Sequence, residues 1–197
     1  MTALPANHPY TALEARFRRL SAVGGALSML GWDQAAMMPA GGAAARAEQM
    51  ATLGVIRHEN LTDPALADLL AAAEGQAGTL DEWQAANLRE MRREWRHAAA
   101  LPADLVEARS RAASACEMVW RGARKDNDFA RLRPSLEDLL RLTREIAQAK
   151  AEAFDVAPYD ALLDEYEPDG SSAAIDAIFG ELADFLPAYV ERAQQKQ

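Results

Sequence analysis

Histidine, a common ligand of catalytic metals, occurs only three times in the sequence, as His8, His58 and His97. The segment HENLT, residues 58–62, comes nearest to a zinc-binding helix, in which two histidines four positions apart face one ion and the intervening glutamate acts as a base. Position 62 is a threonine, so the second imidazole is missing. We therefore expect His58 to be exposed near a helix end, His97 to be solvated, and His8 to belong to an N-terminal cap.

An acidic cluster between residues 160 and 169 could hold calcium. A calcium loop of the EF-hand type needs oxygen ligands at alternating positions around a glycine, but two leucines and a proline interrupt this cluster. The pattern favours a short amphipathic turn with a solvated acidic face. Paired carboxylates for acid–base catalysis remain an alternative, although no nearby histidine or lysine would tune them. The acids are Asp160, Asp164, Glu165, Glu167 and Asp169.

Motifs of other enzyme classes are missing from the sequence. It has no GxSxG nucleophile elbow, no P-loop and no GxGxxG dinucleotide motif. Cys116 falls on an apolar helix face, where a cysteine is more often a packed small side chain than a nucleophile. We expect the four tryptophans to be core or interface residues: Trp32, Trp83, Trp95 and Trp120. Residue chemistry alone therefore predicts a domain without a catalytic centre.

Composition excludes several classes of partner. The formal charge of −9 disfavours nucleic acid and anionic membranes. One cysteine cannot form an intrachain disulfide, and neither a secretory signal nor a run of about 18 apolar residues is present. We expect a cytoplasmic protein that binds neither nucleic acid nor membrane.

Helix-forming residues dominate the chain, whereas valine and isoleucine are scarce. The sequence therefore predicts an all-α fold, a bundle-like array of about six long helices with short connections, in a single domain spanning residues 1–197. The apolar periodicity predicts a first helix from about Pro9 to Gly31 and a second helix after Gly42. Later boundary signals are a capping box at Thr79–Glu82, a start at Pro102, a stop at 126–128, and a cap at Ser171 or Ser172.

One stretch carries a family resemblance. LGWDQAAMMPAGGAAARAEQMATL, residues 30–53, resembles the N-terminal signature of the carboxypeptidase Taq family of zinc metallocarboxypeptidases. In that signature Trp-Asp-Gln is followed by Met-Pro and by a helix start of the form Gly-Ala-x-x-Arg-Ala-Glu-Gln. The similarity continues in order through residues 86–95, 101–108, 120–129 and 159–170.

The resemblance implies a mostly helical homodimer with a deep groove that holds zinc, in which N-terminal helices form a wall or cover. Such a hydrolase removes C-terminal residues from peptides, using a zinc-bound water that a glutamate deprotonates. The family's zinc helix lies C-terminal to every segment matched here. We therefore expect this chain to be the N-terminal helical portion of such an enzyme, with no catalytic or metal-binding residue, no bound zinc and no activity alone.

The resemblance also suggests a role for the break between the first two helices. The indole of Trp32 would pack between helices, Asp33 would cap or pair with an arginine such as Arg46, and Pro39 with two glycines would force the turn. We favour this structural role over direct contact with the substrate. The candidate residues for the structural or groove-facing motif are Trp32, Asp33, Gln34, Arg46, Tyr159 and Asp160.

A second hypothesis belongs to another class of protein. The 197 residues would act alone as a helical binding or oligomerisation module without catalysis. If the helices instead pack against polypeptide that is not part of this chain, they should expose a large apolar patch and self-associate.

Overall fold

The structure, a computed structural model, describes residues 4–196. Residue contacts divide the chain into two compact units, Met1–Ile146 and Ala147–Gln197, which we call unit 1 and unit 2. All regular secondary structure in the described residues is helical, which confirms the predicted all-α class. None of the helices within residues 4–196 combines the length and apolar character needed to cross a membrane.

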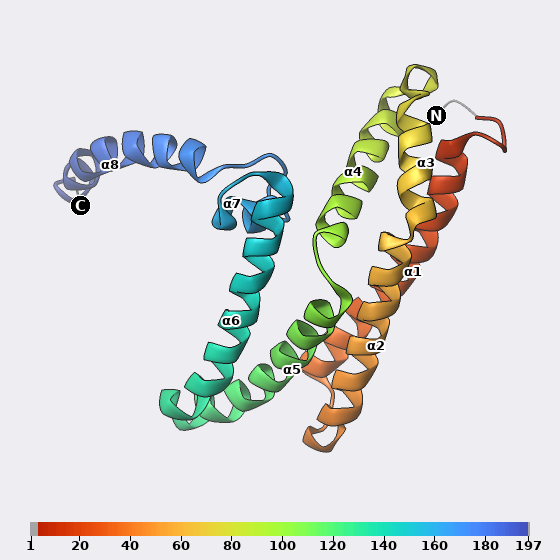
Figure 1. Cartoon of the computed structure of the whole chain (residues 1–197). Helices are drawn as coiled ribbons and strands as arrows, with labels where there is room; N and C mark the ends of the chain where they lie inside the picture. Colours follow the sequence, from red (N-terminus) through yellow and green to blue (C-terminus); the bar gives the residue numbers. More distant parts are fainter. Residues whose placement is uncertain (1–3, 197) are drawn as a thin grey trace. The chain divides into compact units, whose positions relative to one another are not determined.

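The described residues form eight α-helices rather than about six (Figure 1). The two additional helices are the short ones at Pro64–Glu74 and Pro158–Leu163. Each begins at a proline, where the sequence suggested a continuation of the previous helix or a turn. The helices are α1 (Pro9–Ala36), α2 (Ala43–Thr62), α3 (Pro64–Glu74), α4 (Glu82–Ala99), α5 (Ala103–Asp126), α6 (Phe129–Phe154), α7 (Pro158–Leu163) and α8 (Ser172–Gln194). Two 3-10 turns, η1 (Ala40–Gly42) and η2 (Ala77–Thr79), join α1 to α2 and α3 to α4.

Helix α1 extends five residues beyond its predicted end at Gly31. A glycine inside a helix costs only about 1 kcal/mol relative to alanine, so it weakens the helix without ending it. The helix ends where the amides of Met37 and Met38 both donate to the Asp33 carbonyl, directly before Pro39. The residues Trp32 to Gln34 therefore belong to the last turns of α1 and not to a loop.

The N-cap of α4 is Asp81, two residues after the predicted N-cap Thr79, and the capping box is Asp81–Gln84. Asp81 accepts a bond from the Gln84 amide, and the Gln84 side chain accepts one from the Asp81 amide, each at 3.0 Å. The Thr79 hydroxyl instead donates to the Gln76 carbonyl. Two other predicted boundaries are confirmed: Asn127 ends α5 in the left-handed conformation with φ 53°, and Ser171 caps α8.

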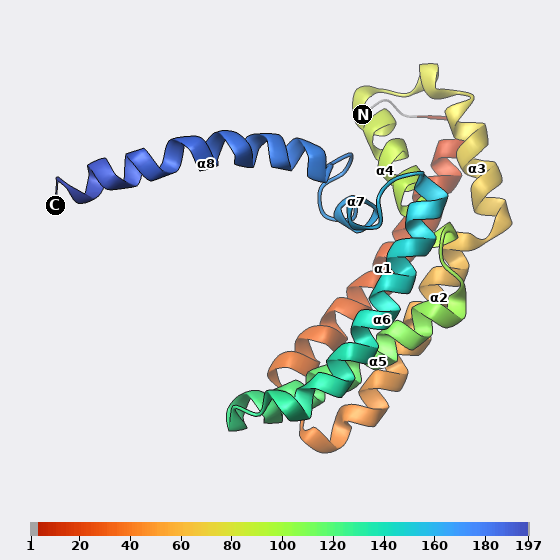
Figure 2. The same cartoon turned by 60° about the vertical axis from the view of Figure 1, so that its left-hand side comes forward.

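The core of unit 1 forms where α1, α2, α3 and α4 pack together, and these helices lie side by side in Figures 1 and 2. Burying a leucine side chain contributes about 1.5–3 kcal/mol, so this cluster is the main source of stability in the unit. Helix α5 packs along α2. The buried cluster consists of Tyr10, Leu13, Leu20, Leu61, Leu66, Leu70, Ala73, Leu88 and Met91.

The histidines are more buried than the sequence predicted. His58 and His97, expected to be exposed, are 8% and 9% exposed. Both lie on helices that pack against other helices, which the sequence of a single helix does not reveal. His8 does cap α1, because its Nδ1 atom accepts the Tyr10 amide at 3.1 Å. Burial lowers the pKa of His58 below its ordinary value, outweighing a hydrogen bond with the Leu101 backbone.

This shift predicts a pH dependence of folding stability. The folded state resists protonation of His58, so its contribution is complete above the unfolded pKa of about 6.5 and is lost as the pH falls below that value. We expect His58→Gln to reduce the decline in the free energy of unfolding between pH 7.5 and pH 5.5. Urea unfolding of both proteins at several pH values measures this decline. Parallel curves for the two proteins would show that His58 does not cause it.

Candidate functional site

The corner between α1 and α2 is held by Arg46. Its guanidinium pairs with the Asp33 carboxylate, with Nη2 and Oδ2 2.6 Å apart, and also donates to the Leu30 carbonyl at 2.7 Å. The predicted pair of Asp33 with Arg46 is therefore present. Because Arg46 is mostly buried and bonds two groups near the end of α1, it fixes how α2 leaves the turn.

A second polar cluster joins α1 to α5. The side chain of Gln34 is buried, and its amide donates to the Glu117 carboxylate. Arg121 donates to the same carboxylate at 2.6 Å and to the backbone carbonyl of Gln34. The side-chain amide and the backbone carbonyl of Gln34 thus each meet a charged partner on α5. The sequence analysis identified Gln34 but missed Glu117 and Arg121, whose four-residue spacing marks an ion pair without indicating a partner on another helix.

Trp32 does not pack between helices as predicted, since it is 58% exposed. Successive residues of a helix differ by about 100° around its axis, so a residue two positions from the buried Gln34 points to the opposite side. Met29 and Met37, on either side of Trp32 in the sequence, are also exposed. At about 100° per residue Met29 falls about 60° from Trp32, so α1 ends with a buried polar side at Gln34 and an exposed side that carries a thioether and an indole.

The other tryptophans divide between core and surface. Trp95 packs against the unit 1 core, and the guanidinium carbon of Arg92 lies 4.9 Å from its ring centre. Trp83 and Trp120 are exposed, so they do not belong to the core. Cys116 is buried on α5, as predicted.

A further charged group connects α2 with α5. Arg111 pairs with Glu48 of α2 at 2.7 Å and with Glu107 of its own helix at 2.9 Å. The hydrogen bond and the positive charge of Arg111 lower the pKa of Glu48. These three side chains are among those that line a pocket of about 200 Å³ between the two helices. Because the ion pairs are exposed to solvent, we assign them little weight in stability.

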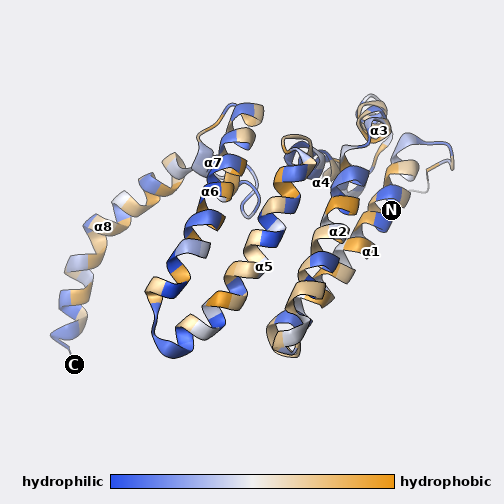
Figure 3. Ribbon diagram, turned by 60° about the horizontal axis from the view of Figure 1, so that its bottom comes forward, coloured by the Kyte–Doolittle hydropathy of each residue, from blue (hydrophilic) through white to orange (hydrophobic). Residues whose placement is uncertain are grey.

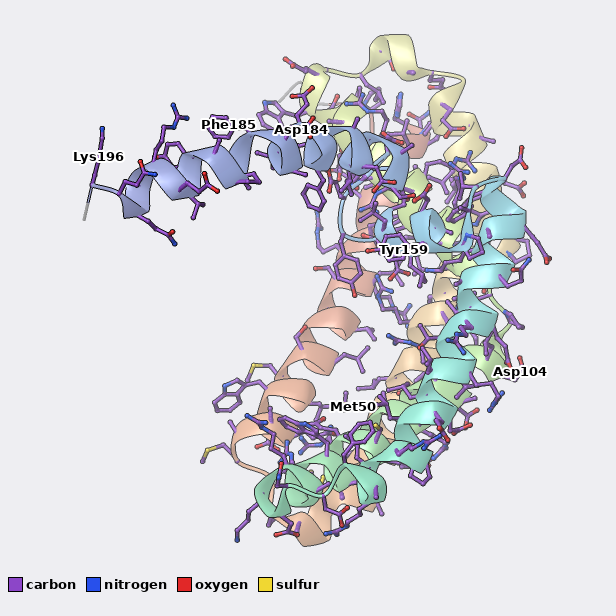
Figure 4. The ribbon with its side chains drawn as sticks, turned by 90° about the vertical axis from the view of Figure 1, so that its left-hand side faces the viewer. Met50, Asp104, Tyr159, Asp184, Phe185 and Lys196 are labelled. Carbon is purple, nitrogen blue, oxygen red and sulfur yellow. The ribbon has the colours of Figure 1, made fainter. Side chains whose placement is uncertain are left out.

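Within unit 2, Asp160 connects α7 to the start of α8. Its Oδ1 atom accepts the Ser172 amide at 2.9 Å and the Ser172 hydroxyl at 2.5 Å, and these bonds lower the pKa of Asp160. Tyr159, labelled in Figure 4, is exposed. The buried Lys150 pairs with Glu165, and Asp164 accepts the amide of Asp169 at 2.8 Å. The carboxylates of three acids of the predicted cluster, Asp160, Asp164 and Glu165, thus accept local bonds from caps, turns and Lys150.

Within residues 4–196, no three histidine, cysteine, aspartate or glutamate side chains come together in a way that could hold an ion. Four of the six candidate residues form bonds between helices: Asp33, Gln34 and Arg46 in unit 1, and Asp160 in unit 2. Trp32 and Tyr159 are the two that present a ring to solvent.

The α1–α2 corner yields a prediction about stability. We expect Arg46→Ala to lower the free energy of unfolding by about 1–2 kcal/mol, because two charge-assisted hydrogen bonds are lost. A double-mutant cycle with Asp33→Ala should give a coupling of about 1 kcal/mol. Arg141→Ala is the matched control, since Arg141 pairs only with exposed acids of its own helix in the contacts described and should leave stability nearly unchanged. Equal effects of the two arginine substitutions in urea unfolding would contradict the assignment.

Comparison with known proteins covers nearly the whole chain. Thermostable carboxypeptidase 1 of Pyrococcus furiosus is 30% identical over 186 residues, which are 94% of this chain and 37% of the relative. Thermostable carboxypeptidase 1 of Thermus thermophilus is 34% identical over 175 residues, 84% of this chain and 34% of the relative. The solved structure of Trypanosoma cruzi metallocarboxypeptidase 1 matches with a TM-score of 0.78 and 38% identity, over 96% of this chain and 38% of that one.

The chain therefore spans little more than a third of the length of these relatives. Residues 12–197 match the family described as carboxypeptidase Taq (M32) metallopeptidase. The family match along residues 12–197 and the similarity to the solved relative agree, and the chain belongs to the carboxypeptidase Taq (M32) metallopeptidase family.

Proposed function

We propose that this chain is the N-terminal helical portion of a metallocarboxypeptidase that hydrolyses C-terminal residues from peptides. In this role its helices form a wall or cover of the substrate groove. The observation that carries the proposal is the family match over residues 12–197, combined with coverage of only 34–38% of the relatives. The chain has the family's helices over this stretch, while most of the relatives' length lies outside the match.

The metal of the enzyme does not fit the residues described here, since no three suitable side chains cluster within residues 4–196. We propose that the metal ligands and the catalytic groups come from the part of the family fold that this chain does not cover. Zinc is the metal that we expect in the complete enzyme. The contribution of this chain is then to shape the groove and exclude solvent from it.

Within this proposal, the corner residues have distinct roles. Asp33, Gln34 and Arg46 hold α1 against α2 and α5, because their polar atoms are used in bonds between these helices. The indole of Trp32 is instead exposed to solvent and does not hold these helices together. We propose that Trp32 is the groove-facing residue of the motif, and that it contacts an extended peptide through its ring. Tyr159 is the corresponding candidate in unit 2.

Other properties of the complete enzyme follow from the same proposal. We expect it to be a cytoplasmic homodimer that acts on peptides, with residues 1–197 serving as one helical domain. A stand-alone helical binding or oligomerisation module is the second candidate function. The observation that favours the module is the set of large apolar side chains exposed on α8. The two candidates differ in whether the chain can take part in peptide hydrolysis.

A chimera tests the proposed function. Residues 12–197 of this chain replace the aligned stretch of the Pyrococcus furiosus relative, and release of C-terminal residues from a peptide is measured with and without a chelator. We expect hydrolysis that the chelator abolishes and added zinc restores. In the same chimera, Trp32→Ala should lower kcat/KM by about tenfold, or about 1.4 kcal/mol, mainly through KM. Trp83→Ala, which alters another exposed indole of unit 1, should have no such effect.

The control is the same exchange made with the aligned stretch of the Thermus thermophilus relative. If that chimera hydrolyses peptides, and the chimera carrying this chain is equally helical but inactive, the proposed function is wrong. Equal kinetic effects of the two tryptophan substitutions would reject the role of Trp32 alone.

A further inference from the structure

Helix α8 carries an apolar face that its own unit leaves uncovered. Figure 3 shows hydrophobic residues recurring along this helix. No residue of α8 is buried, although all of α8 is described, and seven large apolar side chains are each 41–62% exposed. The buried residues of unit 2 lie before α8, at Ala147, Lys150, Ala151 and Ala161. The seven exposed residues, which we call the α8 stripe, are Ile178, Phe179, Leu182, Phe185, Leu186, Tyr189 and Val190.

The spacing within the α8 stripe places its members on one side of the helix. At about 100° per residue, the seven positions fall within an arc of about 140°. A stripe of this width is typical of a helix that packs onto a globular core, whereas a two-stranded coiled coil uses a narrower seam. The shape of the stripe therefore favours a broad partner surface over a single second helix.

The extent of the α8 stripe also requires a partner. Seven half-exposed large side chains present on the order of 500 Å² of apolar surface, more than most monomeric proteins leave contiguous. With an equal area from a partner, the contact would bury about 1,000 Å², which is near the lower bound of specific interfaces.

The charged residues of α8 lie outside the stripe, and they indicate which charges a partner surface should carry around its apolar centre. Asp176, Glu181, Asp184 and Glu191 are acidic, and Arg192 is the only basic residue of the helix. At about 100° per residue, Asp184 and Glu191 fall on the side opposite the stripe, while Glu181 and Arg192 flank one edge. A partner with an apolar centre and a mainly basic border is therefore complementary, and a second acidic copy of α8 is less so.

The match to a solved relative shows how much polypeptide lies outside the stretch that contains α8. The solved Trypanosoma cruzi relative matches 96% of this chain, so about eight of the 197 residues are unmatched. Most of α8, which has 23 residues, must therefore lie within the match. Because this chain covers only 38% of that relative, most of the relative's polypeptide remains to pack against the helix.

We propose that the α8 stripe is the docking surface for the part of the metallopeptidase fold that this chain does not cover. The partner surface is an apolar layer of that fold with a mainly basic border. Through this contact the helical portion is fixed to the portion that supplies the metal. The inference rests on the proposed function, but it concerns the packing of the helix and can be measured without peptide hydrolysis.

Thiol accessibility tests the proposal, because the chain has one cysteine and that residue is buried. Phe185→Cys places a thiol in the α8 stripe, and Ala177→Cys places one on the opposite side of the same helix. Each variant is made in the 197-residue chain and in the chimera with the Pyrococcus furiosus relative. Iodoacetamide labelling is followed by peptide mass spectrometry, which separates these positions from other cysteines. Leu182→Cys gives a second thiol in the stripe if Phe185→Cys does not fold.

In the 197-residue chain at low concentration, we expect both positions to react at rates within about fivefold of each other. In the chimera, the position 185 thiol should react at least about 100-fold more slowly than the position 177 thiol. Equal reactivity of the two positions in the chimera overturns the proposal. Protection at position 185 that rises with concentration in the chain alone, and is missing from the chimera, identifies a second copy as the partner and also overturns it.

The thiol measurement separates this inference from the proposed function. A chimera that protects position 185 but hydrolyses no peptide supports the docking surface and counts against the proposed function. A chimera that hydrolyses peptides while the thiol at position 185 stays reactive supports the proposed function and counts against the docking surface.

Discussion

A helix with one apolar face is stable only when that face is buried, and this requirement organises both units of the chain. In unit 1, helices α1 to α4 satisfy it for one another around the cluster that includes Leu13, Leu66 and Leu70. In unit 2, α8 leaves the requirement unmet, because its large side chains remain exposed. The same constraint therefore accounts for a core in one unit and a docking surface in the other.

Polar contacts determine how the helices of unit 1 meet, while apolar burial provides most of the stability. Arg46 sets the corner between α1 and α2, and Gln34 connects α1 with α5 through Glu117 and Arg121. A buried amide or guanidinium is costly without a partner, so each of these contacts restricts the geometry that the helices can adopt. Fixing this corner leaves Trp32 on the exposed side of α1. In the proposed contact of Trp32 with a peptide, these bonds would hold the end of α1 that carries the ring.

Local sequence signals predicted the all-α class, the cap at Ser171 and the stop at Asn127, because these depend on residues close together in the chain. They failed where tertiary packing decides, as for the buried His58 and His97. The predicted packing of Trp32 between helices is wrong because α1 continues past Gly31 to Ala36, which places Trp32 and the buried Gln34 on opposite sides of one helix. The pair of Asp33 with Arg46 was predicted because the family signature contains both residues. Glu117 and Arg121 carry no comparable signal, since their partner is 83 and 87 residues away.

We propose that these helices support a metal centre whose ligands come from polypeptide outside this chain. Metal content measured by native mass spectrometry after incubation with zinc tests the claim most directly, with the 197-residue chain and the chimera with the Pyrococcus furiosus relative compared side by side. The account predicts that the chimera retains about one zinc ion per chain after removal of excess metal, and that the 197-residue chain retains none. Stoichiometric zinc retained by the 197-residue chain alone would contradict it.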